Sequence, residues 1–199
     1  MSKYHHGDLR STLIAVAIEL LGEGDIHTLS LRKIAQKAGV SHNAPYMHFA
    51  DKEAVLAAIA EEGFRSLLNV VKTAVSEAGN NSTRQKIIAA SKAYVRFALE
   101  RPNHMQVMFY SYDVEKYPKL LESSQASLNC LFKLVKAGQE NGELGSGNTH
   151  EMTKAIWAMV HGVATLSSTY KKNLLNPEKT MSEEVVSTFL DCLLDGLVK

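Results

Sequence analysis

Apolar residues recur along this chain at helical spacing. At the N-terminus Leu9, Leu13, Val16 and Leu20 lie three or four positions apart, and the tetrapeptide GEGD ends this run. The same spacing returns through most of the sequence, and no alternation of apolar and polar residues is long enough for a useful strand. The pattern therefore predicts an all-α protein, with helices over residues 9–21, 31–38, 41–48, 52–78, 84–100, 119–139, 150–172 and 182–198.

Polar and helix-breaking residues mark the boundaries between these helices. Asp51 is a suitable N-cap for the helix over 52–78. The segment GNNST at 79–83 is the clearest linker, and Pro102 ends the next helix, with a broken segment over 103–118. We therefore expect an N-terminal domain over 1–50, a bridging helix over 51–78 and a second helical domain over 83–199.

The composition limits the possible classes of function. The chain has 199 residues, of which 45% are hydrophobic and 22% charged, and its formal net charge is only +1. A globally basic nucleic-acid-binding protein is excluded, so any such surface has to be local. Cys130 and Cys192 lie in apolar helical contexts, which predicts buried thiols in a reducing compartment rather than a disulfide framework.

Two apolar runs raise the question of a membrane. The N-terminal run is interrupted by Glu19, and no small-residue cleavage site follows it. Residues 155–170 contain no Asp, Glu, Lys or Arg, but a membrane span needs about twenty strongly apolar residues and this run includes His161 and several Ser and Thr. We therefore expect a cytoplasmic protein with no membrane partner.

The helices over 31–38 and 41–48 are joined by a tight turn, which predicts a helix-turn-helix. Ala35 is small enough for the two helices to cross closely, and Gly39 can adopt the positive φ that the turn requires. Ser41 is a suitable N-cap for the helix that follows. Tyr46 and Phe49 lie three apart, so one ring can pack inward while the other faces outward.

The same region is locally basic and polar. Residues 26–50 contain Arg32, Lys33 and Lys37 but no Asp or Glu, while Lys3, His5, His6 and Arg10 lie on the N-terminal arm. Cations at this position suit DNA phosphates, and the exposed polar residues His42, Asn43 and His48 suit base edges in a major groove.

The stretch LSLRKIAQKAGVSHNAPYMHFADKEAVL resembles the DNA-binding part of the TetR family of transcriptional regulators. It contains Ile-Ala-x-x-Ala-Gly-Val-Ser, then Tyr-x-His-Phe, then x-x-Lys-x-x-Leu, and the resemblance extends over about residues 7–67. It implies an N-terminal three-helix helix-turn-helix DNA-binding domain followed by a C-terminal helical ligand-binding and dimerisation domain.

Carried over to matching positions, the resemblance implies DNA contacts on both sides of the turn. Arg32 would lie at the DNA edge, and His48 and Lys52 would approach phosphates. Pro45 stands where most relatives have a threonine or an apolar residue other than proline, which predicts an atypical helix start. The expected DNA-binding residues are Ser30, Arg32, Ser41, His42, Asn43, Ala44, Tyr46, His48 and Lys52.

A second group of residues suggests a ligand pocket. The stretch YVRFALERPNHMQVMFYSY is rich in aromatic and methionine side chains, which suit an adaptable apolar pocket, although the same residues could form ordinary core. The stretch IWAMVHGVATL resembles a C-terminal ligand-domain subgroup named for its Trp, His and Gly. The ligand would be small and largely apolar, and the candidate lining residues are Tyr94, Phe97, Met105, Met108, Phe109, Trp157 and His161.

The last helix carries an apolar stripe wider than a monomer needs, which predicts an interface, although the stripe could also belong to an intramolecular core. The resemblance implies a homodimer through the last two helices, about residues 150–198. His42 and His48 lie six apart, the wrong spacing for a metal on one helix face, and the sequence contains no phosphate-binding glycine loop or nucleophile elbow. We therefore expect no enzyme activity, cofactor or metal. The resemblance, the basic helix-turn-helix and the apolar pocket together predict a homodimeric repressor released from its DNA operator by a small apolar ligand, with activation as an alternative because the sign depends on where the operator lies. The alternatives are an all-α enzyme or ligand carrier with a structural N-terminal helix pair, and a DNA-bound architectural protein.

Overall fold

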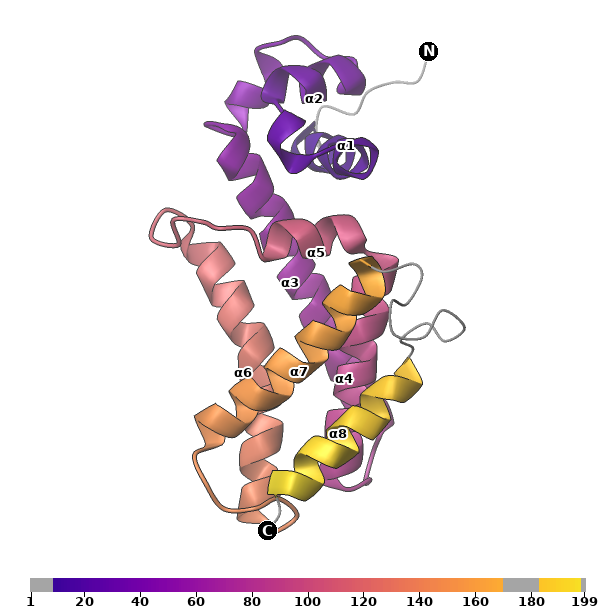
Figure 1. Cartoon of the computed structure of the whole chain (residues 1–199). Helices are drawn as coiled ribbons and strands as arrows, with labels where there is room; N and C mark the ends of the chain where they lie inside the picture. Colours follow the sequence, from indigo (N-terminus) through magenta and orange to yellow (C-terminus); the bar gives the residue numbers. More distant parts are fainter. Residues whose placement is uncertain (1–8, 170–182, 198–199) are drawn as a thin grey trace. The chain divides into compact units, whose positions relative to one another are not determined.

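The computed structural model describes residues 9–169 and 183–197, and within these ranges every regular element is a helix (Figure 1). The all-α prediction is therefore confirmed. The elements are α1 (Leu9–Glu23), the 3₁₀ helix η1 (Ile26–Thr28), α2 (Leu31–Ala38), the 3₁₀ helix η2 (Ala44–Met47), α3 (Lys52–Glu77), α4 (Thr83–Glu100), α5 (Pro102–Met108), α6 (Pro118–Glu140), α7 (Thr149–Thr169) and α8 (Glu183–Leu197).

The chain divides into two compact units. The first, the N-terminal unit, contains the residues up to Gly63 together with Asn103–Leu121. The second, the C-terminal unit, contains Phe64–Pro102 and the residues from Glu122 onward. Helix α3 contributes to both units, because the division falls within it. The functional division at residues 79–83 stays a prediction.

Helix α2 has strong local signals at both ends. The Ser30 hydroxyl accepts a hydrogen bond from the Lys33 amide at 3.2 Å, and Gly39 ends the helix with φ of 69°. Its inner face, which includes the fully buried Ala35, packs against α1 in the core of the N-terminal unit. The expected N-cap of α3 is also confirmed, since the Asp51 carboxylate accepts from the Ala54 amide at 2.8 Å.

Helix α5 occupies part of the segment that the sequence predicted to be broken. Pro102 begins this helix, because proline at a first helical position loses no intrahelical hydrogen bond. The Asn103 side-chain amide donates to the Ile18 carbonyl oxygen at 3.1 Å, and Gly63 leaves room for Met108, whose Sδ would lie 2.6 Å from an added Cβ. These contacts hold α5 within the N-terminal unit.

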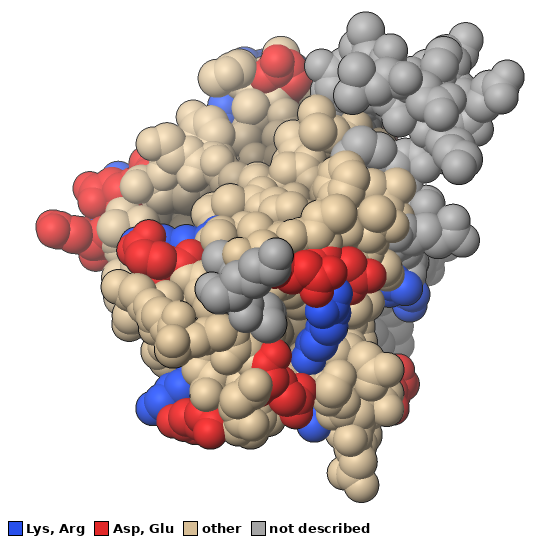
Figure 2. All heavy atoms as spheres, turned by 60° about the horizontal axis from the view of Figure 1, so that its bottom comes forward, with Lys and Arg blue, Asp and Glu red and all other residues tan. Residues whose placement is uncertain are grey.

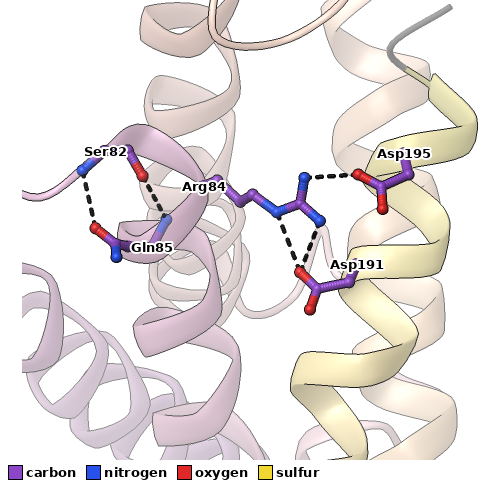
Figure 3. A network of polar contacts seen from close by, with 5 residues as sticks. All are labelled: Ser82, Arg84, Gln85, Asp191 and Asp195. Carbon is purple, nitrogen blue, oxygen red and sulfur yellow. Dashed lines mark hydrogen bonds and ion pairs between the residues drawn. The ribbon is translucent and has the colours of Figure 1, made fainter.

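Helices α4, α7 and α8 pack against one another in the C-terminal unit (Figure 1). The N-terminus of α4 has a complete capping box, in which Ser82 and Gln85 bond each other's backbone amides. Two residues into this turn, the Arg84 guanidinium binds Asp191 at 2.8 Å and Asp195 at 2.7 Å, both on α8 (Figure 3). This ion-pair cluster ties the two helices together.

The cysteine prediction is partly wrong. Cys130 is half-buried and Cys192 is exposed, and both are free thiols. The buried side of α8 includes Leu190 and Leu194, four residues apart, so Cys192 midway between them points to the other side. Within the described parts of the chain, no helix is long and apolar enough to cross a membrane.

Candidate functional site

The recognition turn, residues 41–49, is shorter than the predicted helix over 41–48. It contains only the single 3₁₀ helix η2, which Asn43 precedes without a side-chain cap. Ser41 is therefore not the N-cap, and instead its carbonyl oxygen accepts from the Ala44 amide at 3.0 Å. Pro45 lies in the first positions of η2 and has no amide hydrogen to extend a regular helix toward Ser41. The atypical start expected at Pro45 is confirmed.

The backbone after Pro45 is tightly turned. The Pro45 carbonyl oxygen accepts from the amides of His48 at 3.0 Å and Phe49 at 2.9 Å. Phe49 is only 4% exposed, whereas Tyr46 is 58% exposed, so the prediction of one inward and one outward ring is confirmed. The Arg10 guanidinium lies over the Phe49 ring, 5.3 Å from its centroid.

Most of the predicted DNA-binding residues lie at the surface of the N-terminal unit. Ser30, Ala44 and Lys52 are partly buried, and the remaining predicted residues are exposed, namely Arg32, Ser41, His42, Asn43, Tyr46 and His48. The structure adds Met47, which is 83% exposed and which the sequence analysis did not select. Pro45 and Phe49 are buried and lie four residues apart, so Met47 midway between them points away from the core. This spacing could have identified Met47 from the sequence.

The local positive charge is smaller than the sequence suggested. Lys37 is paired with two carboxylates of α1, Glu23 at 2.6 Å and Glu19 at 3.3 Å, and these bonds raise the pKa of Lys37. Arg32 and Lys33 therefore carry the cationic edge of α2. The Lys52 ammonium donates to the His27 carbonyl oxygen at 3.2 Å, which holds it beside η1. Lys3, His5 and His6 lie outside the described residues.

The C-terminal unit contains a cluster of Tyr94, Trp157 and His161, between α4 and α7. The Tyr94 hydroxyl lies 2.8 Å from His161 Nδ1, and the Trp157 ring stacks on the imidazole at a centroid distance of 5.5 Å. Burial raises the pKa of Tyr94 and lowers the pKa of His161. Both groups are therefore neutral at pH 7, and the imidazole tautomer determines which of the two donates.

The other candidate pocket residues do not all fall in this cluster. Phe97 is buried on α4, in the same unit. Met105, Met108 and Phe109 belong to the N-terminal unit, in which Met108 is buried and Phe109 is exposed. The ligand role of the seven residues stays a prediction. Within the described ranges, no three His, Cys, Asp or Glu side chains gather as a metal site.

The face shown in Figure 2 provides a contrast with a nucleic-acid-binding surface. Among its described residues, acidic and basic side chains alternate in small groups, and most of the surface carries no charge. No broad cationic patch appears among them, so the described residues of this face do not form a surface suited to a phosphate backbone.

Known protein families and solved structures match this chain over most of its length. Residues 13–59 match the family described as "Bacterial regulatory proteins, tetR family", and residues 87–191 match "Tetracyclin repressor-like, C-terminal domain". A solved protein of unknown function from Rhodococcus sp. RHA1 is 33% identical, with all of both chains covered and a TM-score of 0.85.

Two further similarities concern regulators from Bacillus subtilis. A fatty acid metabolism regulator protein is 22% identical over 190 residues, which cover 93% of each chain. The crystal structure of a transcriptional regulator FadR in complex with stearoyl-CoA is 19% identical, with a TM-score of 0.73 over 94% of this chain and 98% of that one. The latter similarity establishes the shared fold.

Proposed function

The chain belongs to the tetR family of bacterial regulatory proteins and is a ligand-responsive DNA-binding transcriptional regulator, and we propose that it is a homodimeric repressor released from its operator by a small, largely apolar ligand. The observation that carries the DNA-binding part is the recognition turn. It presents Tyr46 and Met47 to solvent beside the cationic edge of α2. The alternative of an all-α enzyme or ligand carrier is not favoured, because both family matches are to regulators.

The proposed DNA-binding residues divide by chemistry into two sets. Arg32, Lys33 and Lys52 are cations that suit phosphate oxygens, and His48 has the ring nitrogens for the same contact. The base-edge contacts would come from the recognition turn, where Met47 offers an apolar surface for the methyl group of a thymine. The proposed base-contacting residues are His42, Asn43, Ala44, Tyr46 and Met47.

We propose that the last two helices pair two copies of the chain. Helices α7 and α8 pack together, yet Leu166 and Phe189 on them are exposed. Exposed apolar side chains of this size are typical of a protein interface. A two-fold dimer would place two recognition turns about 34 Å apart, on successive turns of a roughly palindromic operator.

The ligand would bind in the C-terminal unit. The Tyr94–His161 pair offers one neutral polar group among buried aromatic and aliphatic residues, which suits an apolar ligand with a single polar end. Since FadR is a relative that holds stearoyl-CoA, acyl-CoA is the first class to test. The ligand would act through its different affinities for two states, typically with about 1–3 kcal/mol of coupling.

The deciding experiment selects bound duplexes from a random pool at near-physiological salt, using the full chain. Enrichment of one two-fold symmetric site supports the proposal and supplies the operator. Operator affinity is then titrated with stearoyl-CoA and shorter acyl-CoAs, and the dimer is measured by sedimentation. Tyr46→Ala and Lys52→Ala should each weaken operator binding with the fold unchanged. A folded wild-type protein that enriches no site, with or without these ligands, would contradict the repressor proposal.

A further inference from the structure

The N-terminal unit contains a cavity of about 340 Å³, apart from the proposed ligand cluster around Tyr94. Its lining comes from the start of α1, the end of the recognition turn, one face of α3 and residues 116–120. This volume lies within the range of about 300–1,000 Å³ that is usual for small-molecule sites. All of these segments belong to the same compact unit.

The α3 wall is lined by small side chains. Ala54, Ala57 and Ala58 have the spacing that places residues on one helical face, and Glu61 follows at the next turn. The buried ring of Phe49 and the buried side chain of Leu120 add to this apolar lining. Since alanine leaves space that a longer side chain would occupy, this face is open enough for an apolar ligand.

The charged groups around the cavity are mostly cations. Arg10, Lys116 and Lys119 line it, against Glu61 as the one carboxylate among its described lining residues. Glu53 lies 3.5 Å from the Lys116 ammonium and offsets part of that charge. Arg10 is held over the Phe49 ring, so one cation lies directly beside the apolar wall.

We propose that this cavity binds a small amphipathic carboxylate, with its apolar body against the alanine face of α3 and its carboxylate among Arg10, Lys116 and Lys119. His48 and Phe49 line the same cavity and end the recognition turn. A bound carboxylate would therefore neutralise cations and restrict side chains next to the DNA-binding residues, and would weaken operator affinity. The binding itself is independent of the proposed function, whereas the effect on operator affinity rests on it.

The test is a calorimetric titration of the full-length protein with octanoate in the absence of DNA. Octanol, of equal chain length but uncharged, and inorganic phosphate, charged but without a chain, are the controls. Octanoate should saturate one site per chain. Loss of the Lys119 charge in Lys119→Met should weaken it about tenfold, as expected for a charge-assisted contact. Ala54→Leu should abolish binding by filling the cavity.

Lys133→Met is the matched control, because Lys133 is an exposed lysine of α6 in the other unit and should leave octanoate affinity unchanged. If Ala54→Leu does not fold, the octanoate affinities of Lys119→Met and Lys133→Met still test the proposal. The proposal is overturned if octanol binds as tightly as octanoate, or if phosphate displaces octanoate at equal concentration. The same holds if Lys119→Met binds octanoate as tightly as the wild type. It is also overturned if Trp157→Ala alone removes binding, since the probe would then lie in the C-terminal unit.

The two proposals fail separately. Octanoate binding by a folded protein that selects no operator would contradict the repressor and leave the cavity assignment standing. Selection of an operator by a protein that binds no octanoate would contradict only the cavity assignment. Where both hold, saturating octanoate should weaken operator binding in the wild type and not in Lys119→Met.

Discussion

The recognition turn and the Tyr94–His161 cluster distribute polar and apolar groups in opposite ways. The turn exposes a methionine and a tyrosine ring, whereas the cluster buries a phenol hydroxyl against an imidazole. A buried polar group reduces stability unless it is hydrogen-bonded, whereas exposed apolar surface is typical of a site that binds a partner. In the cluster the two polar groups satisfy each other, whereas Tyr46 and Met47 would gain contacts only from the DNA that we propose binds the turn. This difference indicates which residues serve the fold and which serve binding.

The largest difference between the two regions should be the loss of folding stability when one tyrosine hydroxyl is removed from each of them. Tyr94→Phe leaves His161 Nδ1 without this hydrogen-bond partner, so the free energy of unfolding should fall by about 1–3 kcal/mol. Tyr46→Phe removes an exposed hydroxyl and should change it by less than about 0.5 kcal/mol. Urea unfolding of both variants measures the contrast. Equal losses would show that the hydrogen bond of the Tyr94 hydroxyl does not stabilise the fold.

A second contrast concerns Met47 and DNA. If its side chain contacts a thymine methyl, replacing that thymine by uracil should cost the wild type about 0.8 kcal/mol, or about fourfold in affinity, since one buried methyl-sized group is lost. Met47→Ala should bind the two duplexes equally and should keep wild-type stability. Uracil scanning of each thymine in the selected operator makes the measurement. A variant that discriminates as the wild type does would exclude the contact.

Replacement of Pro45 should lower the free energy of unfolding by less than Tyr94→Phe does. Pro45→Ala gives the unfolded chain more freedom, and the free energy of unfolding should fall by about 0.4–1 kcal/mol. The alanine also restores an amide hydrogen, so the variant can extend η2 toward Ser41 and its preferred operator should change. Repeating the duplex selection with the variant tests this. An unchanged site would mean that the short turn does not determine base preference.

The smallest effect should be the pH dependence that arises from His161. Burial lowers the pKa of this imidazole in the folded state, so between that value and the ordinary value of about 6.5 the unfolded chain binds more protons. Stability should therefore fall as the pH drops below about 6.5. His161→Gln should remove this part of the loss when unfolding is compared at pH 8 and pH 5.5. If His161→Gln keeps the wild-type pH dependence, the loss of stability at low pH arises from other groups.

The fold was predicted correctly where the sequence signals for a helix lie next to one another in the chain. The prediction for α2 matched both ends, because Ser30 and Gly39 adjoin the helix and agree with its apolar face. Helix α5 was missed, because Pro102 was interpreted only as the end of one helix although it also begins the next. The recognition turn was predicted too long, since the exposed residues on it match the family pattern while Pro45 alone opposes a regular helix.

The contacts between distant segments were not predictable in this way. Tyr94 and His161 were both candidates, but their hydrogen bond joins residues 67 positions apart, and no local pattern specifies it. Met105 and Met108 were grouped with Tyr94 because they are close in sequence, yet they belong to a different compact unit. Arg84 was not selected at all, and it is bound to a carboxylate 107 positions away.

The Arg84 cluster has a consequence for the dimer that we propose. Asp191 and Asp195 lie one helical turn apart and both bind one guanidinium, so together with the buried Leu190 and Leu194 they favour one rotation of α8 about its axis. The outward side chains of α8, among them Phe189 and Cys192, therefore have a set orientation. In the proposed dimer, an α8 held at one angle would favour a second copy of the same chain over partners whose surface ridges are spaced for another angle.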